Sequence, residues 1–301
     1  MNILQKTQKH GLTKSIKIAI SIFFRKIRLV YDQVRFLNTP HYKNPTADEL
    51  VTIEKHLKTH GTQVEDFTPS RQEFKLFQNE NWFPPTYHGG HASGVWDEKL
   101  LEHWVSWLRL GLADYNKDDI FVDVAACASP WAKALRERLG LSAFAIDLSQ
   151  ASQDYSDLSY YRVENATHTT FADASVRGVS LHCAYEMFMG DDDVRLIAEL
   201  ARILKPGGKA IILPLYMHTH ECAYSTPEYY GKGYSDSGAK EYVRMDCYGV
   251  PSSRKYDANT LMKRVIAPIL DVGLKYRLLV LRNKAELGNN IYCHFILEIE
   301  K

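Results

Sequence analysis

The feature that most constrains the fold is an alternation of short elements that begins with Ile120–Val124, an apolar strand interrupted by one acid. Small residues follow in Ala125–Ala128, and Ser129 is a good N-cap for the helix after them. A second apolar strand, Ala143–Ile146, ends on Asp147. Strand, tight turn, helix, strand and acid in this order are typical of a parallel sheet that binds a nucleotide at the carboxyl ends of its strands. We therefore expect an α/β fold.

The spacing within this unit suits a nucleoside ligand. Asp147 lies 18 residues after Ser129, close to the roughly 20 that separate the turn from the ribose-binding acid in such units. Small side chains let the main chain approach a ligand, and an acid that closes the second strand can accept hydrogen bonds from both ribose hydroxyls.

The C-terminal third of the chain continues the alternation. Asp191–Leu204 predicts an amphipathic helix with acids in its first turn, where they complement the helix dipole. Lys205–Gly208 ends that helix and leads into the strand Lys209–Leu213. A helix capped by Asp257 is expected to run to about Val272.

Two apolar strands close the chain, Leu274–Leu281 and Ile291–Ile299. Gly288-Asn289-Asn290 lies between them and has the composition of a turn. We therefore expect a terminal antiparallel hairpin.

The stretch Arg195–Leu213, RLIAELARILKPGGKAIIL, resembles the helix, LKPGG turn and fifth strand of the type 11 group of class I S-adenosylmethionine-dependent methyltransferases. Phe171–Val176 and His182–Glu186 resemble the segments around that group's fourth strand, and the resemblance covers about Asp118–Lys301. It implies a Rossmann-like, doubly wound, mostly parallel seven-stranded sheet with a C-terminal antiparallel hairpin. It also implies an enzyme that uses S-adenosyl-L-methionine.

The resemblance implies a set of cofactor-binding residues. Asp123 takes the place of the acid in the first motif, Asp147 that of the ribose-binding acid, and Asn165 that of the side chain that contacts the adenine amine, through its carbonyl oxygen. The whole set is Asp123, Ala125, Cys127, Ser129, Asp147, Asn165, Ala166 and His182.

This chain departs from the family in its first loop, where the glycine positions are occupied by Ala125, Cys127 and Ser129. A turn that needs positive φ would be strained with these residues. A catalytically degenerate binding or scaffold protein that keeps the fold is therefore the alternative function. A nicotinamide-dependent oxidoreductase is a third hypothesis, against which the missing G-x-G-x-x-G counts.

Methyl transfer to a hydroxyl acceptor needs alignment, exclusion of water and a base. The loops after the fourth and fifth strands offer His182, Glu186 and His218 as catalytic candidates. With His220 and Cys222, His218 forms an H-x-H-x-C series that could ligate zinc. Because no fourth ligand is evident, we expect no metal.

The segment Glu221–Lys255 is rich in tyrosine. A lid over the active site is one interpretation, and tyrosines there suit a small-molecule or glycan acceptor; an ordinary exposed loop is the other. Before the methyltransferase domain, assigned to 118–301, we expect a helical cap region over 39–117. Its glycine-rich loop carries His88 and His91, which are either functional groups or loop-stabilising hydrogen-bond partners.

Residues 1–38 predict a basic amphipathic helix. Residues 1–37 hold eight Lys or Arg and one acid, a net charge of +7, and apolar residues recur every three or four positions from Ile16 to Leu37. Three interpretations remain open for 12–37: docking on the chain's own domain or self-association, peripheral contact with a membrane, and, least favoured, nucleic acid. We expect no nucleic-acid partner.

Five cysteines without paired spacing favour reduced thiols and a cytoplasmic location, with a peripheral position at the inner face of the membrane as a variant of it. No apolar run approaches the roughly 18 residues that a membrane span needs.

Overall fold

The structure is a computed structural model that describes residues 27–149 and 159–301. Contacts in space group the chain into two compact units. The larger comprises Pro45–Cys222 and Arg254–Lys301; the smaller comprises Ala223–Ser253 and the described part of Met1–Asn44. Each unit is described by itself below.

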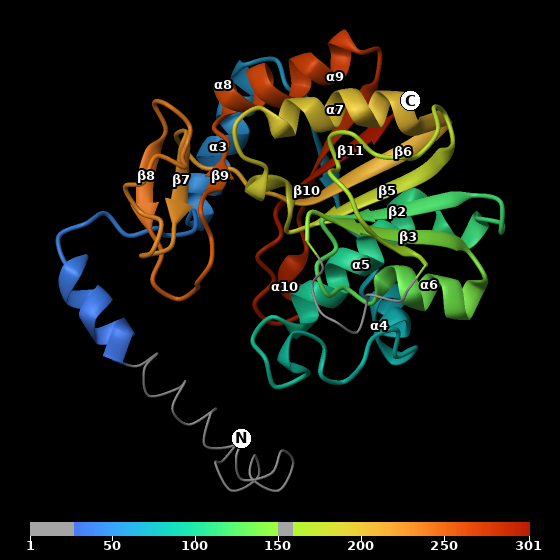
Figure 1. The fold of residues 1–301 in the computed structure, drawn as a ribbon, viewed down its shortest axis with the longest axis horizontal. Helices are drawn as coiled ribbons and strands as arrows, with labels where there is room; N and C mark the ends of the chain where they lie inside the picture. Colours follow the sequence, from blue (N-terminus) through green and yellow to red (C-terminus); the bar gives the residue numbers. More distant parts are fainter. Residues whose placement is uncertain (1–26, 150–158) are drawn as a thin grey trace, which may run out of the picture. The chain divides into compact units, whose positions relative to one another are not determined.

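The larger unit is built on a sheet with the strand order β1-β10-β11-β6-β5-β2-β3-β4 (Figure 1). All neighbouring pairs are parallel except β10 with β11 and β11 with β6. The α/β, Rossmann-like class with antiparallel C-terminal strands is therefore confirmed. The strands are β1 (Val64–Phe67), β2 (Ile120–Val124), β3 (Ser142–Asp147), β4 (Tyr161–Val163), β5 (Val176–His182), β6 (Leu204–Leu215), β10 (Lys275–Leu281) and β11 (Phe295–Glu300).

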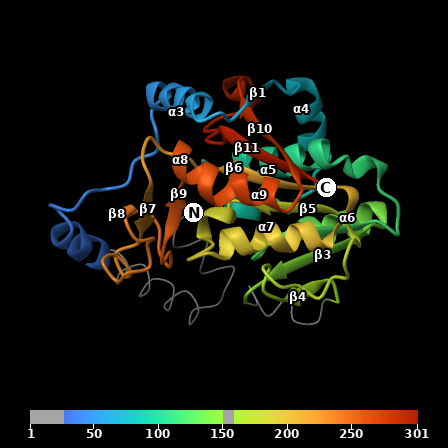
Figure 2. The ribbon, with the colours of Figure 1, turned by 90° about the horizontal axis from the view of Figure 1, so that it is seen from above.

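Helices cover both faces of this sheet, so its central strands are mostly apolar. Phe121 and Val122, neighbours on β2, point to opposite faces and are both fully buried. Figures 1 and 2 show α7, α8 and α9 on one face and α4, α5 and α6 on the other. The helices are α3 (Ala47–Thr59), α4 (Arg71–Asn79), α5 (Trp96–Leu110), α6 (Trp131–Leu139), α7 (Asp192–Ile203), α8 (Ala258–Leu261), α9 (Ala267–Asp271) and α10 (Lys284–Leu287), with a π-helical segment, Met262–Ile266, joining α8 to α9.

Local signals in the sequence place several boundaries. Thr46 and Glu49 form a capping box at the start of α3, and Asp257 caps α8. The turn after α7 requires glycine, because a Cβ on Gly208 would lie 2.8 Å from the Lys205 carbonyl oxygen.

The sheet has one strand more than the seven expected. β1 comes from the region predicted to be helical, and it pairs in parallel with β10, Val64 opposite Leu278. Its sequence, VEDF, is too short and too polar to stand out as a strand.

The last two strands pair antiparallel as expected, and Asn289 and Asn290 lie in a turn between them, but the whole connection is longer than a short hairpin loop. Residues 282–294 connect them and include α10. The backbone amides of this connection are held by acids of α5: Asn289 donates to Asp97, and Tyr292 and Cys293 donate to Glu98. The connection therefore docks on α5 instead of closing a short hairpin.

The smaller unit joins an N-terminal helical segment to the tyrosine-rich segment. Residues 27–35 are helical; Phe36 is buried, with its ring centroid 5.6 Å from that of Tyr230, and Arg28 donates to Glu228 at 3.2 Å. A three-stranded sheet, in the order β8-β7-β9, is formed by β7 (Cys222–Ser225), β8 (Lys240–Val243) and β9 (Ser253–Lys255).

The predicted apolar seam of the N-terminal helix is exposed where the structure describes it. The exposed fractions are 50% for Ile27, 61% for Val30, 72% for Val34 and 75% for Leu37. The part of the predicted helix before Ile27 lies outside the described residues. Across 27–149 and 159–301, no helix is long and apolar enough to cross a membrane.

Candidate active site

The loop after β2 takes the strained conformation that its missing glycines suggested. Ala125 has φ 53° and Cys127 has φ 48°, a region that costs an L-residue about 1–2 kcal/mol. Hydrogen bonds hold the loop there: the Cys127 amide donates to Asp147 Oδ2 at 2.9 Å, and the Tyr161 hydroxyl donates to the Cys127 carbonyl at 2.9 Å. The loop is thus tied to Asp147, the last residue of β3, and to Tyr161, the first residue of β4.

A cavity of about 340 Å³ lies beside Asp147, and we call it the Asp147 cavity. It brings together five predicted cofactor residues: Ala125, Cys127, Asp147, Asn165 and Ala166. Apolar side chains complete its wall, among them Ile146, Met187 and Phe188. The carboxyl groups of Glu164 and Asp192 line it as well. A cavity with apolar walls and a few polar groups suits a nucleoside.

Asn165 does not offer the hydrogen-bonding group expected of it. Its Oδ1 already accepts from the amide and the hydroxyl of Thr167, both at 2.9 Å. The carbonyl oxygen that was expected to accept from an adenine amine is therefore occupied, which leaves the amide nitrogen, a donor, for a ligand.

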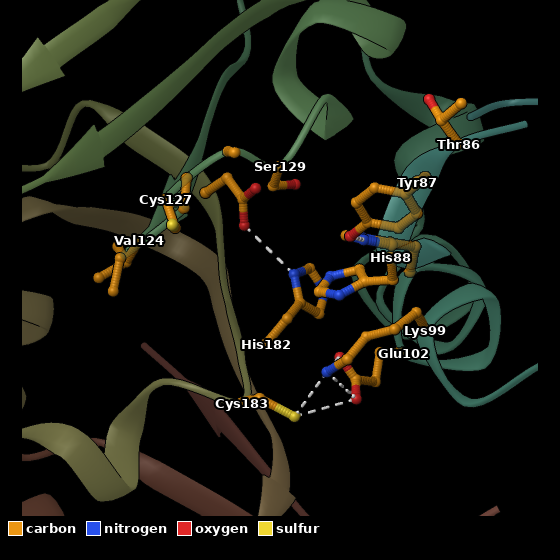
Figure 3. A pocket seen from close by; sticks show the side chains of 15 residues that line it. Thr86, Tyr87, His88, Lys99, Glu102, Val124, Cys127, Ser129, His182 and Cys183 are labelled. Atoms are coloured by element: carbon orange, nitrogen blue, oxygen red, sulfur yellow. Dashed lines mark hydrogen bonds and ion pairs between the residues drawn. The ribbon is translucent and has the colours of Figure 1, made fainter. Parts of the chain in front are cut away.

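A second cavity, of about 460 Å³, lies against α5, and we call it the Glu102 cavity (Figure 3). Its lining includes Asp123, Ser129 and His182 of the predicted set. It shares Ala125, Cys127 and Cys183 with the Asp147 cavity, so the two adjoin at these residues.

The buried polar face of α5 was not predicted from the sequence. Lys99, Glu102, His103 and Ser106 are all buried. Their spacing of three, one and three places them on one side of the helix. Charged residues at helical spacing within a helix otherwise crowded with Leu and Trp are the signal that could have revealed a buried polar site.

Lys99, Glu102 and Cys183 form a tight buried group (Figure 3). The Lys99 ammonium donates to both Glu102 oxygens at 2.9 and 3.0 Å and to Cys183 Sγ at 2.8 Å. Burial alone would lower the pKa of Lys99, but Glu102 and Cys183 raise it above its usual range. Burial, and after it Glu102, raises the pKa of the Cys183 thiol. The group is therefore an ammonium, a carboxylate and a protonated thiol.

Asp123 and His182 form a second group at the same sheet edge. Asp123 Oδ1 lies 3.2 Å from His182 Nδ1 and accepts from the Ser180 hydroxyl at 3.0 Å. Since Ser106 Oγ donates its single proton to the Glu102 carbonyl, it accepts from His182 Nε2, 2.5 Å away. Nε2 of His182 is therefore a donor, whereas Nδ1 lies close to Asp123 but makes no hydrogen bond among the described residues.

His88 and His103 are the other imidazoles that line the Glu102 cavity. His103 Nε2 lies 2.8 Å from the Tyr87 hydroxyl, and burial lowers its pKa far below the usual range. His88 adopts a left-handed conformation, φ 46° and ψ 32°, and burial followed by Lys99 lowers its pKa. Both rings are neutral near pH 7. His91 instead stacks on Trp96, with ring centroids 4.2 Å apart.

Two predicted catalytic residues line neither cavity. Glu186 is buried beneath the sheet edge, its pKa is raised by burial, and its Oε2 has no hydrogen-bond partner among the described residues. His218 lies beside His220 and Cys222 after the end of β6.

Comparison with known protein families identifies the class of domain. Residues 122–212 match the family model described as a methyltransferase domain. These residues therefore belong to an S-adenosylmethionine-dependent methyltransferase domain, and the expected family and cofactor are confirmed for this domain. No curated protein matches the chain.

Among solved structures, the chain is similar to 1,6-didemethyltoxoflavin-N1-methyltransferase of Burkholderia thailandensis at 10% identity, covering 87% of this chain and 93% of that one with a TM-score of 0.44. A methyltransferase of Methanosarcina mazei is 16% identical, with 62% and 94% covered and a TM-score of 0.40. A putative methyltransferase of Haloferax volcanii, in complex with its Trm112 activator, is 18% identical, with 69% and 92% covered and a TM-score of 0.39.

Proposed function

We propose that this chain transfers the methyl group of S-adenosylmethionine to a small-molecule or glycan acceptor. The observation that supports this most is the junction of the two cavities at Ala125, Cys127 and Cys183. A cofactor whose adenosine fills the Asp147 cavity places its sulfonium near this junction, and the acceptor then approaches from the Glu102 cavity. In-line displacement needs that arrangement.

Residues of this chain would hold the cofactor at several points. Asp147 accepts from the ribose hydroxyls, and Asn165 with Ala166 borders the adenine. Asp123 Oδ2 is buried, lines the Glu102 cavity and has no hydrogen-bond partner among the described residues, so it can accept from the ammonium of the methionine moiety. Ala125, Cys127 and Ser129 supply the backbone that borders the ligand, and His182 positions Asp123.

We assign to His88 the role of the base that removes the proton from the acceptor hydroxyl. A hydroxyl acceptor loses a proton as it takes the methyl group, so the base must be neutral beforehand and must reach the cavity. His88 is an exposed residue that lines the cavity, and its partial desolvation there, followed by the nearby Lys99, lowers its pKa and favours the neutral ring. His103 also meets both conditions, but its Nε2 is occupied by the Tyr87 hydroxyl.

Titration of the purified chain with S-adenosylmethionine by calorimetry tests the binding step, with Asp147→Ala as the variant that loses the ribose contact. Turnover on a panel of polar hydroxylated acceptors tests the chemistry. Conversion of His88 to Asn is expected to lower kcat by about 100-fold or more while the cofactor Kd stays unchanged. His91→Asn, in the same loop but outside both cavities, serves as the control.

Binding without turnover on any acceptor would favour the degenerate binding or scaffold protein over an enzyme. Failure to bind the cofactor at millimolar concentration would exclude both the enzyme and the assigned cofactor site.

For residues 12–37 we propose contact with an anionic membrane surface, with the chain in the cytoplasm at the inner face. An exposed apolar seam of Ile27, Val30, Val34 and Leu37, together with the net charge of +7 over residues 1–37, supports it. None of the five cysteines forms a disulfide, as suits a reducing compartment.

Sedimentation with liposomes of anionic and of neutral lipid tests this contact. The double variant Val30→Asp/Val34→Asp is expected to abolish recovery with anionic liposomes, whereas Val51→Asp, at another exposed apolar position, is expected to leave it unchanged. Equal recovery of the seam variant and the wild type would eliminate the membrane contact. A mass by sedimentation equilibrium that doubles in the wild type alone would favour self-association instead.

A further inference from the structure

Three metal-ligand side chains gather just beyond the end of β6. His218, His220 and Cys222 each offer one donor atom, and these atoms all lie within 4.8 Å of one another. Tetrahedral zinc bonds of about 2.0–2.3 Å place donor atoms somewhat under 4 Å apart. The three atoms are therefore within about an ångström of ligating positions.

Strand geometry alone does not produce this arrangement. Alternate residues of an extended segment face one side but stand about 6.6 Å apart along it, so positions 218 and 222 would be roughly 13 Å apart. The segment bends at Thr219 and His220. This bend brings together side chains that a straight strand would hold apart.

The segment that carries the ligands is anchored to the core. The His218 amide donates to the Tyr256 carbonyl at 2.8 Å, and Met217 forms a parallel bridge with Tyr256. His218 and Cys222 are buried, and His220 is partly buried. A ligand set on a fixed backbone loses little conformational entropy when it binds an ion.

The hydroxyl of Thr219 lies next to both imidazole rings. Thr219 Oγ1 lies 3.2 Å from Nδ1 of His218 and 3.2 Å from Nδ1 of His220. His218 Nδ1 already accepts from the Thr219 amide, so the hydroxyl can donate to His218 Nδ1 and accept from the His220 Nδ1–H, which turns the His220 Nε2 lone pair outward. Binding through His218 Nε2 would replace the 2.9 Å hydrogen bond that the Thr219 amide donates to His218 Nδ1.

We propose that His218, His220 and Cys222 bind one zinc ion, with a water in the fourth position. Two nitrogens and one thiolate sulfur are the donor set that zinc prefers over magnesium or calcium. None of the three residues lines the Asp147 or the Glu102 cavity. The ion therefore fastens the segment that leaves β6 and takes no part in methyl transfer, so the proposal stands or falls independently of the proposed function.

Cobalt(II) substitution tests the site directly. The chain is stripped with a chelator and titrated with Co²⁺, and the wild type is expected to bind one ion with the visible bands of tetrahedral cobalt and a thiolate-to-cobalt charge-transfer band. Cys222→Ser should lose the charge-transfer band, and His220→Asn should bind about 100-fold more weakly. Cys247→Ser, at another cysteine outside the cluster, should match the wild type.

A wild type that shows no thiolate-to-cobalt band at saturating cobalt would overturn the proposal, as would a band that Cys222→Ser retains. If Cys222→Ser does not fold, His220→Asn decides the question, because His220 is only partly buried. A cobalt affinity of His220→Asn equal to that of the wild type would also overturn the proposal. Zinc content of the protein as purified, one per chain in the wild type and Cys247→Ser only, gives an independent readout.

Discussion

Oδ1 of Asp123 lies 3.2 Å from Nδ1 of His182, and this contact links the carboxyl ends of the neighbouring strands β2 and β5. The Ser180 hydroxyl donates to the same oxygen at 3.0 Å. Ser180 thus holds one carboxylate oxygen by a hydrogen bond and His182 lies beside that oxygen, while the other, Oδ2, has no hydrogen-bond partner among the described residues. A buried carboxylate oxygen without a partner is costly unless a ligand supplies a donor.

Asp123→Asn is therefore expected to weaken cofactor binding by about 10- to 100-fold, because a charge-assisted hydrogen bond contributes about 1.5–3 kcal/mol. Isothermal calorimetry with S-adenosylmethionine measures the change. Asp118→Asn, which makes the same substitution at an exposed position, should leave the Kd unchanged. An unaltered Kd for Asp123→Asn would remove this residue from the cofactor site.

The strained loop predicts that glycine is stabilising at two positions. Ala125→Gly and Cys127→Gly relieve positive φ and should each raise the free energy of unfolding by about 1 kcal/mol. Ala126→Gly, between them, lacks a positive φ to relieve and should lower it by about 0.5–1 kcal/mol. Urea denaturation distinguishes the three variants. A loss of stability at all three positions would contradict the argument.

At Asn165, a carboxylate should bind the cofactor better than the native amide. The Oδ1 atom is already occupied by Thr167, so Asn165→Asp adds a second oxygen that can accept from the adenine amine. We expect the affinity for S-adenosylmethionine to rise about fivefold, measured by calorimetry. Asn116→Asp, at an exposed turn of the same kind, is the control and should have no effect.

The buried pair of Lys99 and Glu102 predicts a non-additive effect of mutation. Glu102→Gln leaves the Lys99 ammonium buried without its counter-charge and should lower the free energy of unfolding by about 3–5 kcal/mol. The double variant Lys99→Met/Glu102→Met removes both charges and should be less destabilised than the single variant. A double-mutant cycle by urea denaturation measures this, and additive losses would argue against a coupled pair.

Glu98 predicts a pH dependence of stability. Burial first, and Glu102 second, raises the pKa of this carboxyl from 4.5 to about 8 in the folded chain. Between these pH values the folded chain binds a proton that the unfolded chain has released. Stability therefore falls as the pH rises from about 4.5 to 8, by up to about 1.4 kcal/mol per pH unit. Glu98→Gln should flatten this slope, whereas Glu73→Gln, at an exposed position, should not; an equal slope in Glu98→Gln would refute the shift.

Much of the sheet could be predicted from local signals. The strand at Ile120–Val124 and the helices after Thr46 and Asp257 follow from apolar runs and capping residues within a few positions. β1 could not be predicted, because VEDF becomes a strand only through its pairing with β10. Tertiary pairing of this kind leaves no pattern in the short segment itself.

The candidate site, too, could be predicted only in part. Asp147 and Asn165 follow strands in the order of a known unit, so their meeting at one cavity was predictable from sequence order. The contribution of α5 was not, because Lys99 and Glu102 come from a helix outside that unit. Polar residues within an apolar helix signal a buried site but do not identify what they face.

The pairing of β1 with β10 also determines when the sheet can be completed during synthesis. Val64 cannot pair until its partner Leu278 has been synthesised. Synthesis of the roughly 200 residues between them takes about 10–40 s at 5–20 residues per second. In that interval the β1 segment has no strand to pair with. In a chain that lacks β1, the outer edge of β10 stays open to pairing with other chains. Ribosome-bound chains would therefore depend on holdase chaperones until the C-terminal strands emerge.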